Sequence, residues 1–197
     1  NTQPGYREEI VKRLRQYTGW NLRSSPSLIE AMQSMGPFVC LSNTLKLLAL
    51  ELIRIANDIR LLSSGPRTGL AEIRLPAVQP GSSIMPGKVN PVMAEVLNMI
   101  AFQVVGNDLT IALASQAGQL ELNVMMPVII HNLLLSMEIL KNGVRVFQER
   151  CIAGIEADEE RCKEYMEKSL GLATLLNPYI GYGRAAEVAK KALAASS

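Results

Sequence analysis

The sequence predicts an all-α fold, with long helices in a bundle and a small group of helices at the C-terminal end. Hydrophobic residues make up 48% of the 197 residues and aromatic residues only 5%, so the apolar mass is mainly aliphatic, unlike that of most sheet proteins. In two long segments apolar residues also recur at alternating steps of four and three, the spacing of packed helices, and a third segment is close to it.

Composition and charge exclude several classes of protein. The chain has 20 Lys and Arg against 18 Asp and Glu, so we expect no nucleic-acid partner. It has no run of eighteen uninterrupted apolar residues, which predicts no membrane-spanning segment. Three cysteines, Cys40, Cys151 and Cys162, lie in apolar helical patterns without CxxC spacing, as buried reduced thiols of a cytoplasmic protein would. Because the first residue is Asn1 and no leader follows, we expect a piece of a longer protein.

The elements before residue 63 are two short helices and one long one. Residues 7–17 have one apolar face and predict a surface helix that ends at Gly19. A second short helix is expected from Ser25, with Pro26 as its first residue. Residues 38–62 predict a long helix that Gly and Pro then end. Its expected seam is Leu41, Leu45, Leu48, Leu52, Ile55, Ile59 and Leu62.

Residues 65–90 predict a long loop, because they contain eight Gly or Pro residues. Long loops in compact domains are commonly functional, so this is the first place to look for chemistry. Two more long helices follow. One is expected from Pro91, capped by Asn90, to Ala117, and the other from about Pro127. The expected seam of the latter is Leu133, Met137, Leu140, Val144, Phe147 and Cys151.

After residue 154 the chain becomes more charged and predicts a surface helix, a break at Asn177–Pro178 and Gly181, and a last helix. These boundaries divide the chain into two parts. We expect residues 1–154 to belong to a central helical-bundle domain that carries a catalytic loop at 81–90. Residues 155–197 are expected to form an incomplete small C-terminal helical domain.

The loop segment GSSIMPGKVN, residues 81–90, is suited to an anionic ligand. Its glycines let the backbone approach a ligand, Lys88 supplies a positive charge, and Asn90 supplies donors beside a helix N-terminus, where the helix dipole favours anions. A phosphate-binding P-loop is excluded, because five residues separate Gly81 from Gly87 and Val89 follows Lys88.

A serine-hydrolase site is excluded as well. The chain has no Gly-x-Ser-x-Gly, and its one histidine is His131, in the apolar run PVIIHNLLL. That context favours a core or interface histidine over a catalytic one.

The segment GSSIMPGKVNP resembles the signature of the aspartase/fumarase superfamily, lyases that release fumarate from succinyl-type substrates. The resemblance continues through NDIRLLSSGPRTGLAEIRLP before the segment and through PVMAEVLNM, VVGND, AGQLELNV and LNPYIGY after it. Within the superfamily, PVMAEVLNM and GQLELNVMMPV are more similar to the aspartate ammonia-lyases than to the fumarases. Met126 departs from this pattern, since the ammonia-lyases commonly have Glu there.

The resemblance implies a lyase that reversibly eliminates ammonia from L-aspartate to give fumarate, without an organic cofactor and with no metal ligands in this chain. Fumarase, with water as the leaving group, is the alternative, and a non-catalytic helical assembly module is a third possibility. It also implies a homotetramer acting on a small dicarboxylate. Such active sites are built from three sequence regions of three subunits, and this chain holds only the third. We therefore expect the chain alone to be inactive, because it lacks the other substrate ligands.

The resemblance also implies residue roles. Ser82 would be the general base and would need to act as an alkoxide, stabilised by a cation and by exclusion of water. Lys88 and Asn90 would bind the substrate carboxylates, and Glu95 would support a histidine that this chain lacks. The remaining expected site residues are Ser83, Ile84 and Met85 against the substrate, and Gly81 and Gly87 in support.

Each of these residues also has a plain structural interpretation. Ser82 and Ser83 could form a turn, Lys88 could be a solvated charge, Asn90 a helix cap and Glu95 a partner of the helix dipole. Only their combination in one segment favours the catalytic interpretation. Two further residues lie in segments similar to the superfamily, Arg67 and Asn123, and we interpret Arg67 as structural or as an interface residue.

Overall fold

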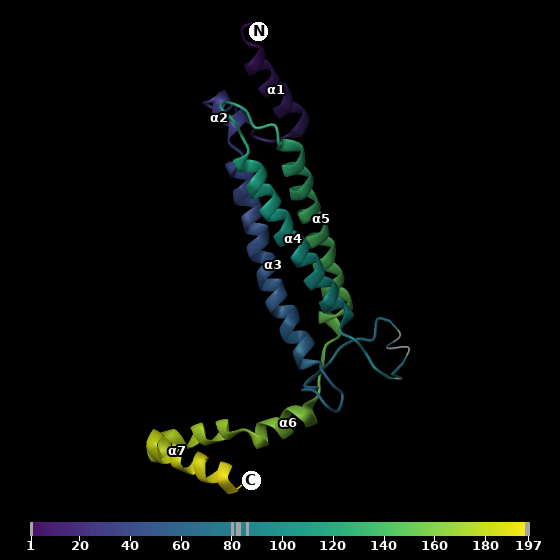
Figure 1. The fold of residues 1–197 in the computed structure, drawn as a ribbon, viewed down its shortest axis with the longest axis vertical. Helices are drawn as coiled ribbons and strands as arrows, with labels where there is room; N and C mark the ends of the chain where they lie inside the picture. The colour runs from purple at the N-terminus through teal and green to yellow at the C-terminus, as the bar shows by residue number, and fades with distance from the viewer. Residues whose placement is uncertain (1, 80, 82–83, 86, 196–197) are drawn as a thin grey trace. The chain divides into compact units, whose positions relative to one another are not determined.

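The computed structural model describes residues 2–79, 81, 84–85 and 87–195 and confirms the all-α prediction (Figure 1). In these ranges the only named strands are β1 (Ile73–Arg74) and β2 (Glu156–Ala157), which pair antiparallel with Ile73 opposite Ala157. The helices are α1 (Tyr6–Thr18), α2 (Leu28–Gln33), α3 (Gly36–Leu62), α4 (Val92–Gln116), α5 (Met126–Arg150), η1 (Ile152–Gly154), α6 (Glu159–Lys168), η2 (Leu170–Leu176) and α7 (Asn177–Ala195).

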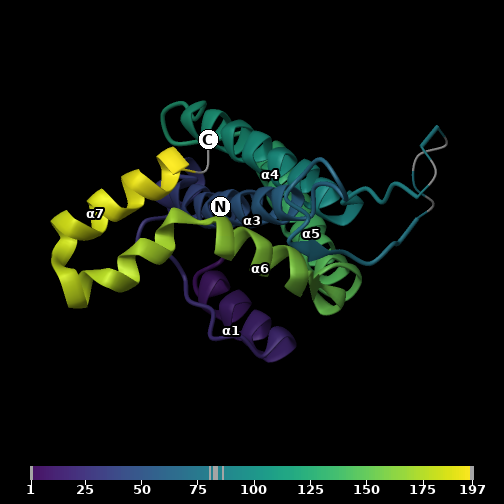
Figure 2. The ribbon, with the colours of Figure 1, turned by 90° about the horizontal axis from the view of Figure 1, so that it is seen from below.

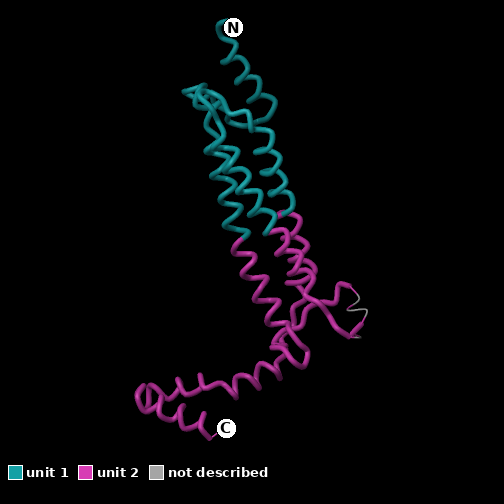
Figure 3. Tube along the Cα trace, in the orientation of Figure 1, with its two compact units in different colours: residues 1–49, 102–139 teal, residues 50–101, 140–197 magenta. Residues whose placement is uncertain are grey.

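The chain divides into two compact units, coloured in Figure 3. Unit 1 contains residues 1–49 and 102–139, and unit 2 contains residues 50–101 and 140–197. Unit 2 holds the end of α3, the start of α4 and the whole stretch between them, which includes the expected catalytic loop. The site is therefore described within unit 2.

Unit 1 packs around an apolar cluster and a buried charge. The cluster is formed by Met35, Ile111, Ala114, Ile129 and Leu133. Beside it the carboxylate of Asp108, on α4, accepts hydrogen bonds from Ser42 at 2.7 Å and from Lys46 at 2.6 Å, both on α3. Because a buried charge is tolerated only when it is paired and hydrogen-bonded, this contact favours one register of α3 against α4.

Unit 2 has its own core, where the end of α3, the start of α4 and the end of α5 meet. Asn98 of α4 donates a hydrogen bond to Asn57 of α3 at 2.8 Å beside this core. Burial in the core also raises the pKa of the Cys151 thiol. The buried residues are Ala56, Ile59, Ala94, Leu97, Phe147 and Cys151.

The expected seam of α3 is correct at four of its seven positions, including Leu62, which is half-buried. Ile59 is buried and Leu45 and Leu52 are half-buried, as predicted. Leu41, Leu48 and Ile55 were expected inside but are 44%, 49% and 38% exposed. The positions next to them hold the small buried residues Ser42, Ala49 and Ala56, because small side chains let neighbouring helices approach closely.

The seam of α5 shows the same correction. Met137 and Val144 are exposed, while the small residues Ser136 and Gly143 are buried in their place. Ser136 accepts a hydrogen bond from Asn107 of α4 at 3.0 Å. A Cβ atom on Gly143 would lie 2.5 Å from Cδ1 of Ile100, so a larger residue on α5 would have to displace the end of the Ile100 side chain on α4.

Several helix ends differ from the expected ones by a few residues. Gly19 ends α1 in a left-handed conformation, as predicted. The second helix begins later than expected, at Leu28, because the side chain of Ser27 accepts a hydrogen bond from the backbone N–H of Glu30. In α4 the first carbonyl to accept an i+4 bond is that of Pro91, one residue after the expected cap.

Three side chains expected in the core are on the surface. Cys151 is buried, but Cys40 and Cys162 are exposed, so the prediction of buried thiols was wrong for two of the three cysteines. All three are free. His131 is exposed too, because it lies on α5 between the inward-facing Ile129 and Leu133, and the core interpretation of this histidine was wrong for the chain.

Among the described helices, α4 alone is long and apolar enough to cross a membrane by these two criteria. Core helices meet the same criteria, and α4 packs Ala94 and Leu97 into one core and Ile111 and Ala114 into the other. It also carries the buried, paired carboxylate of Asp108. Its inner face is therefore explained by packing against α3 and α5.

Replacement of Gly143 by Ala is expected to destabilise the protein by about 1–3 kcal/mol, because the new methyl group overpacks against Ile100. Denaturant unfolding measures the change. Gly183→Ala is the matched control: Gly183 lies in α7, has nothing within 4 Å of its would-be Cβ atom, and should not lower stability. Equal stability of both variants would contradict the close approach of α5 to α4.

Candidate functional site

The expected catalytic segment lies in unit 2, between β1 and α4. Figure 2 shows this part of the chain extending away from the ends of the long helices. The proposed base Ser82 and its neighbour Ser83 lie outside the described residues. The geometry of the site is therefore built from the residues on either side of them.

The described residues of the segment fold back on themselves. A Cβ atom on Gly81 would collide with the carbonyl oxygen of Lys88, so only glycine fits at the start of the segment. Near the other end, Gly87 has φ +77°, a left-handed conformation that also favours glycine. The backbone N–H of the next residue, Lys88, donates to the carbonyl of Met85 at 3.3 Å. The backbone conformation thus explains why both of these positions are glycine.

Three of the described side chains of the segment are exposed to solvent. Ile84 is 86% exposed and Met85 51% exposed, and Lys88 is exposed as well. Contiguous exposed apolar side chains, unlike single ones, mark surfaces that contact another molecule. Their placement fits a site whose remaining walls come from elsewhere.

Asn90 and Glu95 lie where the segment joins α4. Asn90 is half-buried, and its carbonyl accepts a hydrogen bond from the N–H of Val92 at 2.8 Å. Glu95 is half-buried in the first turn of α4, where its charge is favourable to the helix dipole. The N-terminus of a 25-residue helix therefore stands directly behind the amide of Asn90.

A cavity of about 290 Å³ lies next to this junction, wholly within unit 2. Gly87, Val89 and Asn90 form one wall, and residues from 63 to 75 form the other. Arg74 and Asp158 contribute a charged pair at 3.3 Å. The lining residues are Ser63, Gly65, Pro66, Ala71, Ile73, Arg74, Leu75, Gly87, Val89, Asn90, Pro91 and Asp158.

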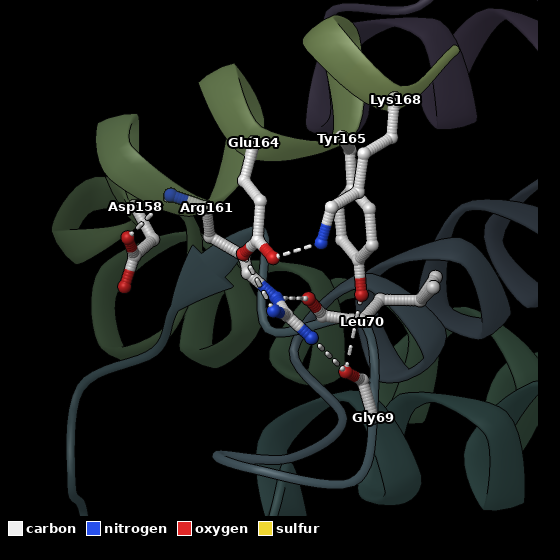
Figure 4. Close-up of polar contacts among 7 residues, drawn as sticks. All are labelled: Gly69, Leu70, Asp158, Arg161, Glu164, Tyr165 and Lys168. Carbon is white, nitrogen blue, oxygen red and sulfur yellow. Dashed lines mark hydrogen bonds and ion pairs between the residues drawn. The ribbon is translucent and has the colours of Figure 1, made fainter. Parts of the chain in front are cut away.

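The stretch 69–74, part of which lines the cavity, is held by α6, which the sequence analysis did not connect with the site. The backbone N–H of Asp158 donates to the carbonyl of Glu72 at 2.8 Å, and the Asp158 side chain caps α6. One turn later Arg161 donates to the carbonyls of Gly69 and Leu70 (Figure 4). No local pattern could reveal these contacts, because the partners lie about ninety positions apart in the sequence.

Charges on α6 reinforce one another around this contact. Glu164 accepts hydrogen bonds from Lys168 at 2.5 Å and from Arg161 at 2.8 Å, and these lower the pKa of its carboxyl group. The same bond to Glu164 raises the pKa of Arg161. The guanidinium carbon of Arg161 also lies 4.5 Å from the centroid of the Tyr165 ring.

The described part of the site carries groups that favour an anion. It offers the ammonium group of Lys88, the amide of Asn90 and the positive end of the α4 dipole. In the described ranges no three His, Cys, Asp or Glu side chains are grouped to hold a metal ion. The histidine that would face Glu95 is likewise not a neighbour in this chain, whose one histidine lies on α5.

Comparisons with known proteins agree with the sequence motif. A family model described as "Lyase" matches residues 1–106, just over half of the chain. The chain belongs to this lyase family, the aspartase/fumarase superfamily. It is 54% identical to an aspartate ammonia-lyase of Bacillus subtilis over 193 residues, and 53% identical to a class II fumarate hydratase of Pseudomonas putida over 192 residues.

Solved structures of the superfamily have the same fold. A fumarate lyase:delta crystallin of Brucella melitensis, bound to cobalt, is 52% identical with a TM-score of 0.94 and is matched by 100% of the chain. A class II fumarase of Schistosoma mansoni is 37% identical with a TM-score of 0.90, and 99% of the chain is covered. The chain spans 43% and 44% of these two proteins and 41% of the two sequence relatives. It thus spans about two fifths of the length of its relatives.

The structure brings some of the predicted site residues together. Gly87 and Asn90 line one cavity, and Gly81 contacts the backbone of Lys88. Ile84, Met85 and Lys88 are outside the set that lines the cavity, and Glu95 lies one turn along α4. The residues that sequence reasoning missed are Arg74, Asp158 and Arg161.

Proposed function

We propose that this chain is part of a lyase that reversibly eliminates ammonia from L-aspartate to give fumarate. The observation that carries the proposal is the segment 81–90, which joins a serine pair, Lys88 and Asn90 at the start of α4. The aspartate ammonia-lyases among the relatives support this reaction for the superfamily members most similar to the chain. The substrate is then a small dicarboxylate, and no cofactor is required.

In the proposed mechanism Ser82 is the catalytic base. Its oxygen, as an alkoxide, takes a proton from the carbon next to the distal carboxylate of the substrate. The electron pair of that C–H bond first enlarges the charge on the carboxylate, then forms the double bond while the C–N bond breaks and ammonia leaves. Lys88 and Asn90 stabilise the doubly charged carboxylate, which is where fixed charges and donors contribute most to the rate.

The described residues supply three conditions for this step. The dipole of α4 favours negative charge beside Asn90. Gly81 and Gly87 allow the backbone conformation that places Lys88 against the start of the segment. Glu95 is available to orient a histidine from another part of the complete protein. Ser83, Ile84 and Met85 are proposed to contact the substrate, because they adjoin the base.

The complete enzyme is proposed to be a homotetramer. In unit 1 the outer face of α4 exposes Phe102, Leu109 and Leu113, each more than half exposed. An apolar stripe of this kind on a helix that is also apolar inside indicates a helix covered by other helices. We propose that α4 meets its counterparts from other subunits, that residues 1–154 form part of the central bundle domain, and that 155–197 form part of a small C-terminal domain. A cytoplasmic location fits the three free thiols.

Fumarase activity, with malate and water in place of aspartate and ammonia, is the second candidate. A class II fumarate hydratase at 53% identity favours keeping it. The two reactions share the base and the carboxylate ligands and differ only in the leaving group. No described residue discriminates between an amine and a hydroxyl leaving group.

Assays of the full-length protein with L-aspartate and L-malate separately test the substrate. We expect fumarate, followed by its ultraviolet absorbance, to form from aspartate much faster than from malate. Ser82→Ala should lower kcat by about 10²–10⁴-fold, the usual contribution of a general base, while Thr174→Ala, which removes a surface hydroxyl, should have no effect. Faster turnover of malate would identify a fumarase, and an unaffected Ser82→Ala variant would support the non-catalytic alternative.

The 197-residue chain alone is expected to form no fumarate from L-aspartate. It holds one of the three regions that build such an active site, so the substrate would lack part of its ligands and the correct orientation. The same assay on the purified chain, at a concentration where the full-length protein gives a clear rate, provides the measurement. Any fumarate above the blank would contradict the shared-site proposal.

Replacement of Leu109 by Glu in the full-length protein should shift the tetramer to smaller species, because a charge is placed in the proposed helix contact. Sedimentation velocity at micromolar concentration gives the distribution. Lys190→Glu on α7 introduces the same side chain at an exposed position and should leave the distribution unchanged. A wild-type protein that sediments as a monomer would refute the tetramer.

A further inference from the structure

We propose that Arg161 and Tyr165 of α6 are positioning residues for the catalytic site. They act through the carbonyl groups of Gly69 and Leu70, which directly precede Ala71, a residue of the cavity lining. The effect on turnover rests on the lyase function proposed above, whereas the effect on the wall itself does not. Neither residue belongs to the segment 81–90, and neither lines the cavity.

The contact is a fixed fork rather than a single bond. Nε of Arg161 donates to the carbonyl of Leu70 at 3.2 Å, and Nη2 donates to the carbonyl of Gly69 at 3.4 Å. The hydroxyl group of Tyr165 donates to the same Gly69 carbonyl at 3.4 Å. A planar guanidinium is suited to two successive acceptors in a way that an ammonium group is not.

The guanidinium is itself held in place from three sides. Glu164 accepts its Nη1–H at 2.8 Å, the ring of Tyr165 lies beneath it, and Lys168 holds Glu164 (Figure 4). The Arg161 side chain is only 28% exposed despite its charge. A residue that served only to stabilise α6 would not need so many contacts.

The wall needs such support at the next residue. Ala71 has φ +52°, a left-handed conformation that is strained for any residue with a Cβ atom, and Ala71 lines the cavity. Its N–H donates to the carbonyl of Ser64 at 2.7 Å, and the N–H of Glu72 donates to Leu62 at 3.0 Å. Strained residues persist only where their surroundings fix them. Arg161 and Tyr165 fix the two peptide groups directly before this residue.

The cavity connects Ala71 with the catalytic segment. Ala71 and Asn90 line the same space, so relaxation at Ala71 changes the shape of the cavity that Asn90 also lines. Because the fork contacts neither the substrate nor the base, its loss should weaken the positioning of the substrate more than the chemical step. We therefore expect KM to rise more than kcat falls.

The experiment compares Arg161→Ala, Arg161→Lys and Tyr165→Phe in the full-length protein, with Lys163→Ala on the same helix as the matched control. Lys163 pairs only loosely, at 3.9 Å, with Glu167. Amide hydrogen exchange at Ala71 and Glu72 should accelerate about 10-fold in Arg161→Ala and less in Tyr165→Phe, because loss of a charged donor costs more than loss of a neutral one. Arg161→Lys should not restore protection, since it keeps the charge without the fork.

A second substitution separates positioning from general stability. Ala71→Gly removes the strain, so in the Arg161→Ala background it should return KM towards the wild-type value. Exchange and KM at wild-type values in all three Arg161 and Tyr165 variants would overturn the proposal. So would faster exchange spread evenly over α6 and α7 with no change at Ala71. If the wild-type protein has no lyase activity, the proposed function fails, but the exchange result still decides whether the fork holds the wall.

Discussion

Close packing of small side chains between the long helices is the constraint on which the rest of this structure depends. Ser42, Ala49 and Ala56 on α3 and Gly143 on α5 occupy inner positions where two leucines, an isoleucine and a valine were available one residue away. The larger side chains are left exposed on the outer faces. The same packing fixes the ends of α3, α4 and α5 in unit 2, and these ends carry both the cavity and the start of the catalytic segment.

Buried polar groups make this packing specific. Apolar helices that alternate large and small residues could slide past one another by a turn at little cost. A one-turn shift would leave the carboxylate of Asp108 without Ser42 and Lys46, or Asn98 without Asn57, and an unpaired buried charge is costly. The charged fork of Arg161 has a comparable role outside the bundle, where the strained conformation of Ala71 would otherwise relax.

The sequence was sufficient for the elements and for the family, and insufficient for packing. Helical period, Gly19 and the breakers of residues 65–90 are local signals, so the helices and the loop were predicted within a few residues. Which of two adjacent apolar faces turns inward is decided by the neighbouring helix, so Leu48 was placed inside where Ala49 is. The fork from Arg161 to Gly69 joins residues from distant parts of the chain, and no local pattern marks it. Ser82 itself was predicted from the motif, and its geometry stays a prediction because it lies outside the described residues.

The most direct test of the account is a crystal structure of the full-length protein with a bound dicarboxylate, such as a non-reactive analogue of L-aspartate. The account predicts the oxygen of Ser82 within hydrogen-bond reach of the carbon that loses its proton, with Lys88 and Asn90 on the adjoining carboxylate. It also predicts the remaining contacts from segments that this chain does not contain. A ligand seated far from Ser82, or one enclosed by these 197 residues alone, would contradict it.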